Sequence, residues 1–186
     1  MRRLLAVAAA LSALVLAACS GTGDERAQES SPFAACPPAA PTSTAPAGGT
    51  PVPDIALDCF AGGPRVSLRT LGRPAVVNFF ASWCAPCRAE LPAVQRLADT
   101  GQVLVLGVVT RDTRSAAADL ATETGVRFPA VFDPDQALLA RLGRTALPVT
   151  LFVDATGRIA HVHTDAALSD ATLTQLVRDK LHVDLP

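Results

Sequence analysis

Two cysteines, Cys84 and Cys87, lie two residues apart in the stretch Ser-Trp-Cys-Ala-Pro-Cys-Arg that begins at Ser82. A C-x-x-C pair can supply two of four zinc ligands, form a structural bridge, or open and close in thiol–disulfide exchange. Exchange needs one sulfur that attacks and a neighbouring sulfur that resolves the mixed disulfide. The other residues of the chain discriminate among these three kinds of chemistry.

Metal and haem sites find little support in the sequence. A zinc site needs two more ligands at suitable spacing, and no second C-x-x-C accompanies His161 and His163. Arg88 occupies the place where a haem-attachment motif has histidine. A structural bridge within one helical turn closes too small a loop to stabilise the fold much. The preferred interpretation is a redox-active pair that uses no metal and no cofactor.

The cysteine pair stands between an expected buried strand and an expected helix. Residues 75–81 form a nearly continuous apolar run, typical of a strand covered on both faces. After Cys84 the sequence predicts a helix to about Thr100, and Gly101 ends it. This order places the first cysteine at the N-terminus of a helix.

A sulfur at a helix N-terminus is favoured as an anion by the unpaired N–H groups and the helix dipole. We therefore expect Cys84 to be an exposed, nucleophilic thiolate. Cys87, one turn further, should face the same way but be more covered. Pro86 suits the first helical turn and stiffens the loop between the cysteines.

Strands and helices alternate along the rest of the chain, which favours an α/β fold with a central sheet flanked by helices. About 130 residues are enough for one hydrophobic core. The further expected strands are residues 55–60 and 65–68 (a hairpin), 103–109, 130–132, 149–153 and 158–163, and the further expected helices are residues 115–124, 134–142 and 168–181.

The N-terminus has the pattern of an export signal. Arg2 and Arg3 precede the uncharged stretch 4–18, and residues 1–18 are interpreted as a signal peptide. An uncleaved anchor helix is the alternative, although the stretch is short for a membrane span. Leu-Ala-Ala-Cys at residues 16–19 resembles a bacterial lipoprotein box, which implies a lipid on Cys19 and a protein held at the extracytoplasmic face of the cell membrane.

Composition divides the exported part into two regions. Residues 19–53 are rich in Pro, Ser, Thr and Ala and are expected to be a flexible tether. Residues 54–186 should form the folded domain. The net charge of −1 gives no reason to expect a nucleic-acid partner. Outside the cytosol disulfides persist, and the four cysteines other than Cys19 allow two bridges in three connectivities.

The stretch Val-Val-Asn-Phe-Phe-Ala-Ser-Trp-Cys-Ala-Pro-Cys-Arg-Ala-Glu-Leu-Pro, residues 76–92, resembles exported thioredoxin-like proteins of the TlpA, ResA and DsbE type. The resemblance covers about residues 54–183. It implies a thioredoxin fold with an added N-terminal β-hairpin, with Cys84 as the nucleophile and Cys87 as the resolving thiol. Pro92 matches the proline that kinks the active-site helix of that family.

The resemblance also implies a second active-site segment. Pro148 matches a proline that is cis in the family and faces the cysteine pair, where the neighbouring backbone meets an incoming peptide. Leu147, together with Trp83 and Pro86, is accordingly expected to contact the substrate.

The same family resemblance also concerns two polar residues near the cysteine pair in the sequence. Asn78 stands where cytosolic thioredoxin has a buried, titratable Asp, and an amide cannot titrate. Glu90 matches a glutamate of the exported branch, and the hypothesis is that it is partly buried and tunes or relays protons during exchange. An ordinary surface glutamate is the alternative.

Cys36 and Cys59 have no catalytic context, and we predict a structural disulfide between them. The predicted function is an extracytoplasmic thiol–disulfide oxidoreductase acting on cysteine-containing proteins, as a reductant of the cytochrome c maturation type. Its partners would be substrates such as apocytochrome c and a membrane thiol–disulfide electron donor. The alternatives are an oxidase that donates disulfides to secreted proteins and a non-catalytic peptide-binding module.

Overall fold

The apolar runs of the sequence form the central strands of one mixed sheet in the computed structural model, which describes residues 31–41 and 49–186. Strand β4 (Ala75–Phe80) is buried at every position because both faces of the sheet are covered. It pairs in parallel with β5 (Leu104–Thr110) and antiparallel with β7 (Val149–Val153). The other strands are β1 (Thr50–Pro51), β2 (Ala56–Cys59), β3 (Val66–Ser67), β6 (Ala130–Asp133) and β8 (Arg158–His163).

The strand order is β1-β8-β7-β4-β5-β6-β2-β3. The expected hairpin forms: β2 pairs antiparallel with β3, and β2 also pairs with β6, so the hairpin extends one edge of the sheet. Because β4, β5 and β6 are parallel, the loops that follow them emerge at the same edge. This edge carries the residues after Phe80, where the cysteine pair begins.

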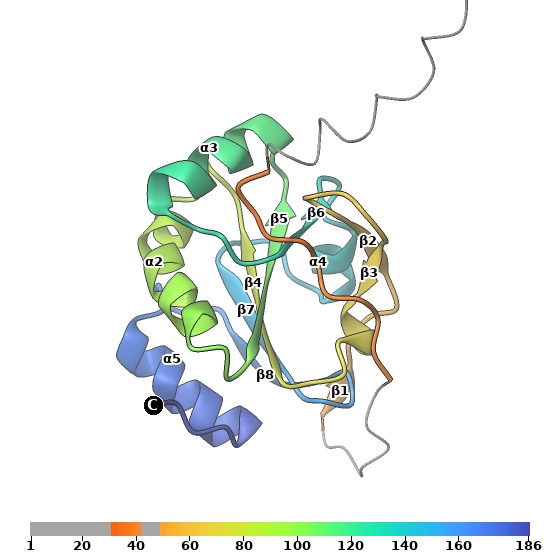
Figure 1. Ribbon diagram of the computed structural model, residues 1–186, viewed down its shortest axis with the longest axis vertical. Helices are drawn as coiled ribbons and strands as arrows, with labels where there is room; N and C mark the ends of the chain where they lie inside the picture. The colour runs from red at the N-terminus through yellow and green to blue at the C-terminus, as the bar shows by residue number, and fades with distance from the viewer. Residues whose placement is uncertain (1–30, 42–48) are drawn as a thin grey trace, which may run out of the picture.

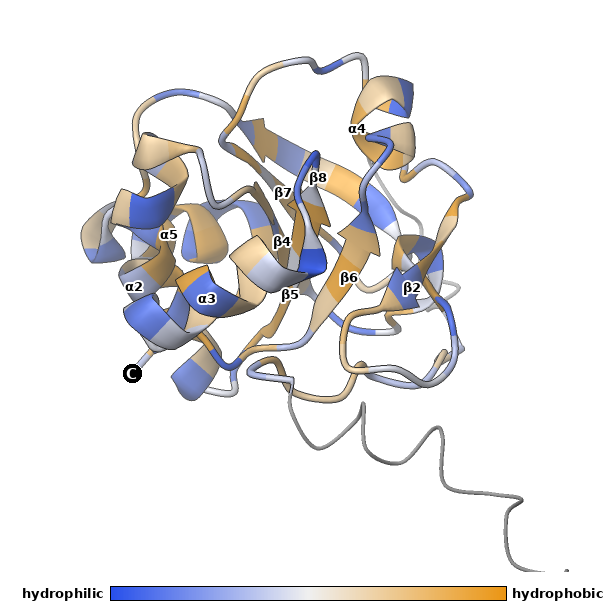
Figure 2. Ribbon diagram, turned by 90° about the horizontal axis from the view of Figure 1, so that it is seen from above, coloured by the Kyte–Doolittle hydropathy of each residue, from blue (hydrophilic) through white to orange (hydrophobic). Residues whose placement is uncertain are grey.

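Helices cover both faces of the sheet, as the alternating pattern predicted. Figure 1 shows α2 (Ala85–Asp99), α3 (Arg114–Thr124) and α5 (Asp170–Leu176) on one face and α4 (Ala137–Arg141) on the other. Each layer has its own apolar core. Figure 2 shows the hydrophobic colouring of the central strands and the mixed colouring of the helices, whose outer faces meet solvent. Short helical turns also occur at Leu68–Thr70 and Val177–Leu181.

Two helices begin later than the sequence suggested. Helix α4 was expected from residue 134, but Gln136 has a left-handed backbone with φ +53°, so the helix begins only after it. The Asp133 carboxylate accepts hydrogen bonds from the N–H groups of Ala137 and Leu138 at 2.8 and 3.1 Å. The last helix was expected from residue 168, but the Ser169 hydroxyl caps it by accepting from the Thr172 N–H at 3.2 Å.

The described parts of the expected tether are packed on the domain, which corrects that expectation. We call residues 31–41 the N-terminal strap. Its Phe33 is 3% exposed and packs against Phe60, with ring centroids 4.6 Å apart, and against Phe80 at 6.2 Å. An isolated aromatic residue in a Pro- and Ala-rich segment was the overlooked sign of burial.

Backbone contacts hold the rest of the described tether in place. The Ala40 N–H donates to the Thr70 carbonyl at 2.8 Å, and a Cβ at Gly72 would lie 2.5 Å from the Ala40 Cβ. Glycine therefore allows the strap to pass closely there. Further along, Thr50–Pro51 pairs with β8, and Val52 is fully buried. The folded domain thus includes residues 31–41 as well as the described chain from residue 49 onward.

The predicted signal peptide and Cys19 lie outside the described residues. Within residues 31–41 and 49–186, none of the helices has the length and apolarity required to cross a bilayer.

Candidate active site

Cys84 and Cys87 form a disulfide at the N-terminus of α2, with their Cα atoms 5.3 Å apart. Cys84 is the N-cap of this helix, and its sulfur accepts the Cys87 N–H at 3.3 Å. The buried strand β4 ends at Phe80, so a rigid element fixes the position of the loop that carries the pair. The site therefore places a sulfur where the helix N–H groups favour negative charge.

Both cysteines are covered in this disulfide state, with Cys84 4% exposed and Cys87 fully buried. The expectation of an exposed Cys84 is wrong for this state, because its sulfur turns toward the helix and both residues join the apolar core beneath α2. The relative order holds, since Cys87 is the more covered of the two. Trp83, at 55% exposure, and Pro86 are exposed residues of the segment that carries the pair.

The Leu147–Pro148 peptide bond is cis. The register of the sheet pairs Val149 with Phe79, so the loop before β7 lies beside the end of β4 and at the same edge as the cysteine pair. Pro148 is buried there, whereas Leu147 is half-buried and packs against both apolar cores. Two loops from distant parts of the sequence thus meet at one edge of the sheet.

Glu90 is fully buried rather than partly buried as expected, one turn after Cys87 on α2. Its Oε1 accepts from the Asn78 Nδ2 at 2.7 Å, and its Oε2 accepts from the Leu168 N–H at 3.0 Å. The same Asn78 Nδ2 donates to the Thr150 Oγ1 at 2.9 Å. This polar network joins α2 to β4, to β7 and to the segment before α5.

Burial raises the pKa of Glu90 above its ordinary value of 4.5, because the carboxylate loses its hydration. The hydrogen bonds from Leu168 and Asn78 and the positive charge of His163 oppose this rise. The result is a carboxyl group that holds its proton to a higher pH than a surface glutamate. Such a group suits proton transfer more than an ordinary helix-surface residue does.

Loop residues beyond β5 brace the cysteine loop from the other side. The Asp112 carboxylate accepts from the Ser82 N–H at 2.5 Å and from the Ser82 hydroxyl at 3.0 Å. The Trp83 Nε1 donates to the Arg111 carbonyl at 2.8 Å. No local motif in the sequence marks Arg111, Asp112 or Thr150, because their contacts depend on strand register.

The second disulfide joins Cys36 of the strap to Cys59 of β2, with a Cα–Cα distance of 5.9 Å. Cys59 is 3% exposed and Cys36 is partly covered. Neither belongs to the elements that form the C-x-x-C site. The bridge fastens the strap to the edge hairpin.

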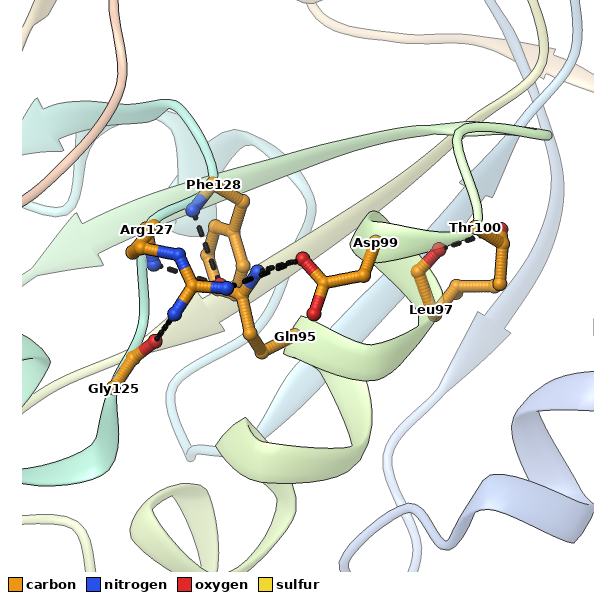
Figure 3. Close-up of polar contacts among 7 residues, drawn as sticks. All are labelled: Gln95, Leu97, Asp99, Thr100, Gly125, Arg127 and Phe128. Atoms are coloured by element: carbon orange, nitrogen blue, oxygen red, sulfur yellow. Dashed lines mark hydrogen bonds and ion pairs between the residues drawn. The ribbon is translucent and has the colours of Figure 1, made fainter.

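A hollow of about 330 Å³ at the opposite end of α2 is not part of this site. Figure 3 shows its polar contacts: the Gln95 Oε1 accepts from the N–H groups of Arg127 and Phe128, at 2.7 and 3.2 Å, and the Gln95 Nε2 donates to Asp99. These side-chain groups are paired with one another and with the chain before β6. They dock that segment on α2.

Within the described ranges, no cluster of three or more His, Cys, Asp and Glu side chains has the arrangement to hold a metal ion. His161 and His163 are half-buried on β8, and the His163 Nε2 lies 2.9 Å from the Ala166 carbonyl oxygen.

Comparison with known proteins gives consistent matches. The Redoxin family model matches residues 47–177. The chain is 36% identical over 118 residues to a thiol:disulfide interchange protein DsbE homolog of Paracoccus denitrificans, covering 62% of this chain and 65% of that protein. It therefore spans slightly less than two thirds of that relative. It is 29% identical over 124 residues to the thiol-disulfide oxidoreductase ResA of Geobacillus thermodenitrificans, covering 65% and 71%.

A solved structure of a secreted Mycobacterium tuberculosis disulfide oxidoreductase homologous to Escherichia coli DsbE has a similar fold. The TM-score is 0.61 at 26% identity, and the match covers 68% of this chain and 96% of that one. The thioredoxin fold that the resemblance implied is thereby confirmed.

Proposed function

The chain belongs to the Redoxin family, and from this premise we propose that it is an extracytoplasmic thiol–disulfide oxidoreductase. The observation that carries the proposal is the Cys84–Cys87 disulfide at the N-terminus of α2, at the sheet edge that it shares with cis-Pro148. A buried strand, a helix N-terminus and a prolyl loop here surround one reactive bond. The names of the relatives support the same chemistry.

In the reducing direction, the Cys84 thiolate attacks one sulfur of a substrate disulfide. The substrate S–S bond breaks, a mixed disulfide with Cys84 forms, and the other substrate sulfur leaves as a thiolate that takes up a proton. Cys87 then loses its proton and attacks the Cys84 sulfur, which releases the second substrate thiol. Two electrons have passed to the substrate, and the Cys84–Cys87 disulfide seen in the structure is the product.

Each further turnover requires a thiol donor that returns two electrons to the pair. We propose a membrane thiol–disulfide protein as this donor and cysteine-containing envelope proteins, such as apocytochrome c, as substrates. Residues 1–18 would direct export, and a lipid on Cys19 would keep the domain at the outer face of the cell membrane. Residues 31–41 pack on the domain, so they would not add to the length of such a tether.

Reduction of insulin disulfides in the presence of dithiothreitol tests the activity. The wild-type protein should accelerate insulin precipitation, and Cys84→Ser should not. Equal rates for the two would instead support a peptide-binding module without turnover.

The equilibrium potential of the Cys84–Cys87 couple against glutathione tests the direction. A potential near that of cytosolic thioredoxin, about −270 mV, supports a reductant, whereas one near −120 mV supports an oxidase of secreted proteins.

We further propose that Glu90 tunes the reactivity of the pair, on the basis of its burial and its position one turn after Cys87. An ionised carboxylate disfavours a nearby thiolate, so Glu90→Gln should shift the alkylation profile of reduced Cys84 to lower pH. An unchanged profile would mean that Glu90 contributes to packing but does not affect the reactivity of Cys84.

A further inference from the structure

Arg111, the first residue after β5, has a backbone conformation that residues other than glycine rarely adopt. Its φ is +52°, and among the described residues other than glycine only Gln136 and His182 also have positive φ. Such a conformation persists where the surroundings enforce it, and it is concentrated at functional sites. The contacts of Arg111 identify what enforces it here.

Arg111 makes three contacts with two segments on either side of the redox disulfide. Its carbonyl accepts the indole N–H of Trp83 at 2.8 Å. Its guanidinium carbon lies 5.3 Å from the centroid of the same indole ring, in a cation–π arrangement. Its Nη1 is 3.5 Å from the carbonyl oxygen of Thr145, in the loop that leads to the cis proline.

These contacts involve the two segments that an incoming polypeptide would meet. Trp83 immediately precedes Cys84, and Thr145 stands three residues before Pro148. The neighbouring Asp112 fixes the cysteine loop through Ser82, so the turn after β5 is itself held firmly. One exposed arginine thereby contacts both the indole and the loop that leads to the cis proline.

The surface beside the indole has room for a substrate. A hollow of about 660 Å³ lies at the carboxyl ends of β5 and β6, where loops from parallel strands converge. Its lining residues are Trp83, Arg111, Asp112, Thr113, Pro134, Asp135 and Gln136.

We propose that Arg111 is a positioning residue for polypeptide substrates: it holds the Trp83 indole against this hollow, at a fixed distance from the cis-proline loop. The chain that flanks the substrate cysteine then lies across the indole while the cysteine reaches Cys84. Trp83 is 55% exposed and would otherwise lose rotamer freedom on binding. Holding the ring before the substrate arrives reduces this entropic cost of binding.

The inference rests on the proposed function. A small disulfide reagent allows the positioning role and the proposed function to be tested separately. A reagent such as 5,5′-dithiobis(2-nitrobenzoate), which reacts with the dithiol without filling the hollow, measures the reactivity of the pair alone. Failure of the wild type with both the reagent and insulin would refute the proposed function. The positioning role is measured by the ratio of kcat/KM for insulin to the rate constant for the reagent.

Arg111→Ala should lower this ratio about three- to fivefold, the loss expected for a cation–π contact at an exposed site, and should do so through KM. Arg111→Lys should restore part of the ratio, since an ammonium can also lie over the ring. Arg111→Gln keeps a donor for the Thr145 carbonyl without the charge, and should resemble Arg111→Ala if the contact with the ring dominates. Arg141→Ala removes another exposed arginine, which lines a different hollow, and should leave the ratio unchanged.

Tryptophan fluorescence gives a readout that is independent of turnover. Trp83 is the only tryptophan of the chain, so its emission reports on this ring alone. Arg111→Ala should increase acrylamide quenching and lower the fluorescence anisotropy at unchanged melting temperature. An unchanged insulin-to-reagent ratio in Arg111→Ala, or quenching equal to the wild type, would overturn the positioning role.

Discussion

The two disulfides of this protein have similar Cα–Cα distances, 5.3 and 5.9 Å, but opposite surroundings. Cys84–Cys87 spans three positions of the sequence, lies at the N-terminus of a helix and follows an exposed tryptophan in the chain. Cys36–Cys59 spans 23 positions and fastens the strap to a strand of the edge hairpin. The Cα–Cα distances do not distinguish the two bridges, so their roles must come from the elements that hold them.

The two bridges differ in the length of chain that they close, and this length determines how much each can stabilise the fold. A long closed loop removes many conformations of the unfolded chain, whereas a loop of three positions removes few. A helix N-terminus, in contrast, stabilises the thiolate that forms when the short bridge opens. We therefore assign reactivity to the first bridge and stabilisation to the second, and four experiments test this division.

The largest expected effect is on turnover. Cys84→Ser should reduce insulin-reduction activity on the order of a thousandfold, as removal of a nucleophile does. The matched control, Cys36→Ala with Cys59→Ala, should retain activity within about twofold, a margin ordinary for changes away from reacting groups. A comparable loss in both proteins would contradict the division.

The next effect is on stability. Removing the Cys36–Cys59 bridge by the same double substitution should lower the free energy of unfolding by about 3 kcal/mol. Urea denaturation of the oxidised proteins, with Cys84–Cys87 intact in both, measures the difference. A free energy of unfolding equal to that of the wild type would show that the bridge does not constrain the unfolded chain.

A smaller effect is expected where the strap enters the core. Phe33→Leu keeps an apolar side chain of similar volume but loses the ring contacts with Phe60 and Phe80, and should lower the free energy of unfolding by about 1 kcal/mol. Combined with loss of the bridge, the effect should be less than additive, because a released strap no longer seats the ring. Strict additivity in a double-mutant cycle would show that Phe33 packs in the core even without the bridge.

The smallest effect is a change in pH dependence at the reactive bridge. Burial raises the folded-state pKa of Glu90, so the folded protein binds this proton more tightly than the unfolded chain does. The free energy of unfolding should therefore fall as the pH rises above 4.5, the ordinary pKa of the group, until the carboxyl is ionised in the folded protein.

Glu90→Gln should reduce this fall and leave the part due to Asp133, whose pKa burial also raises. The oxidised proteins serve for the measurement, since their cysteines do not titrate, and urea denaturation at several pH values gives the free energies. A parallel pH dependence in wild type and variant would mean that Glu90 is not the responsible group.

The sequence by itself determined the reactive pair and the elements that carry it. An apolar run, a cysteine at the start of a helix and turn residues are local signals, and they predicted β4, α2, β7 and β8 closely. The match of residues 76–92 to a known motif also pointed to the prolyl loop. The pairing of Cys36 with Cys59 was predicted because the two cysteines flank the tether and the first strand and have no catalytic context, and the structure contains this bridge.

Only the tertiary structure decided what surrounds that pair. The contacts of Asn78 with Glu90 and Thr150, and of Arg111 with Trp83, join residues that strand register and parallel strand ends bring together. Local propensity contains no information about such long-range pairings. The strap shows the same limit, because its composition favoured disorder, whereas burial of Phe33 and closure of the Cys36–Cys59 bridge, both long-range contacts, offset the entropy of ordering it.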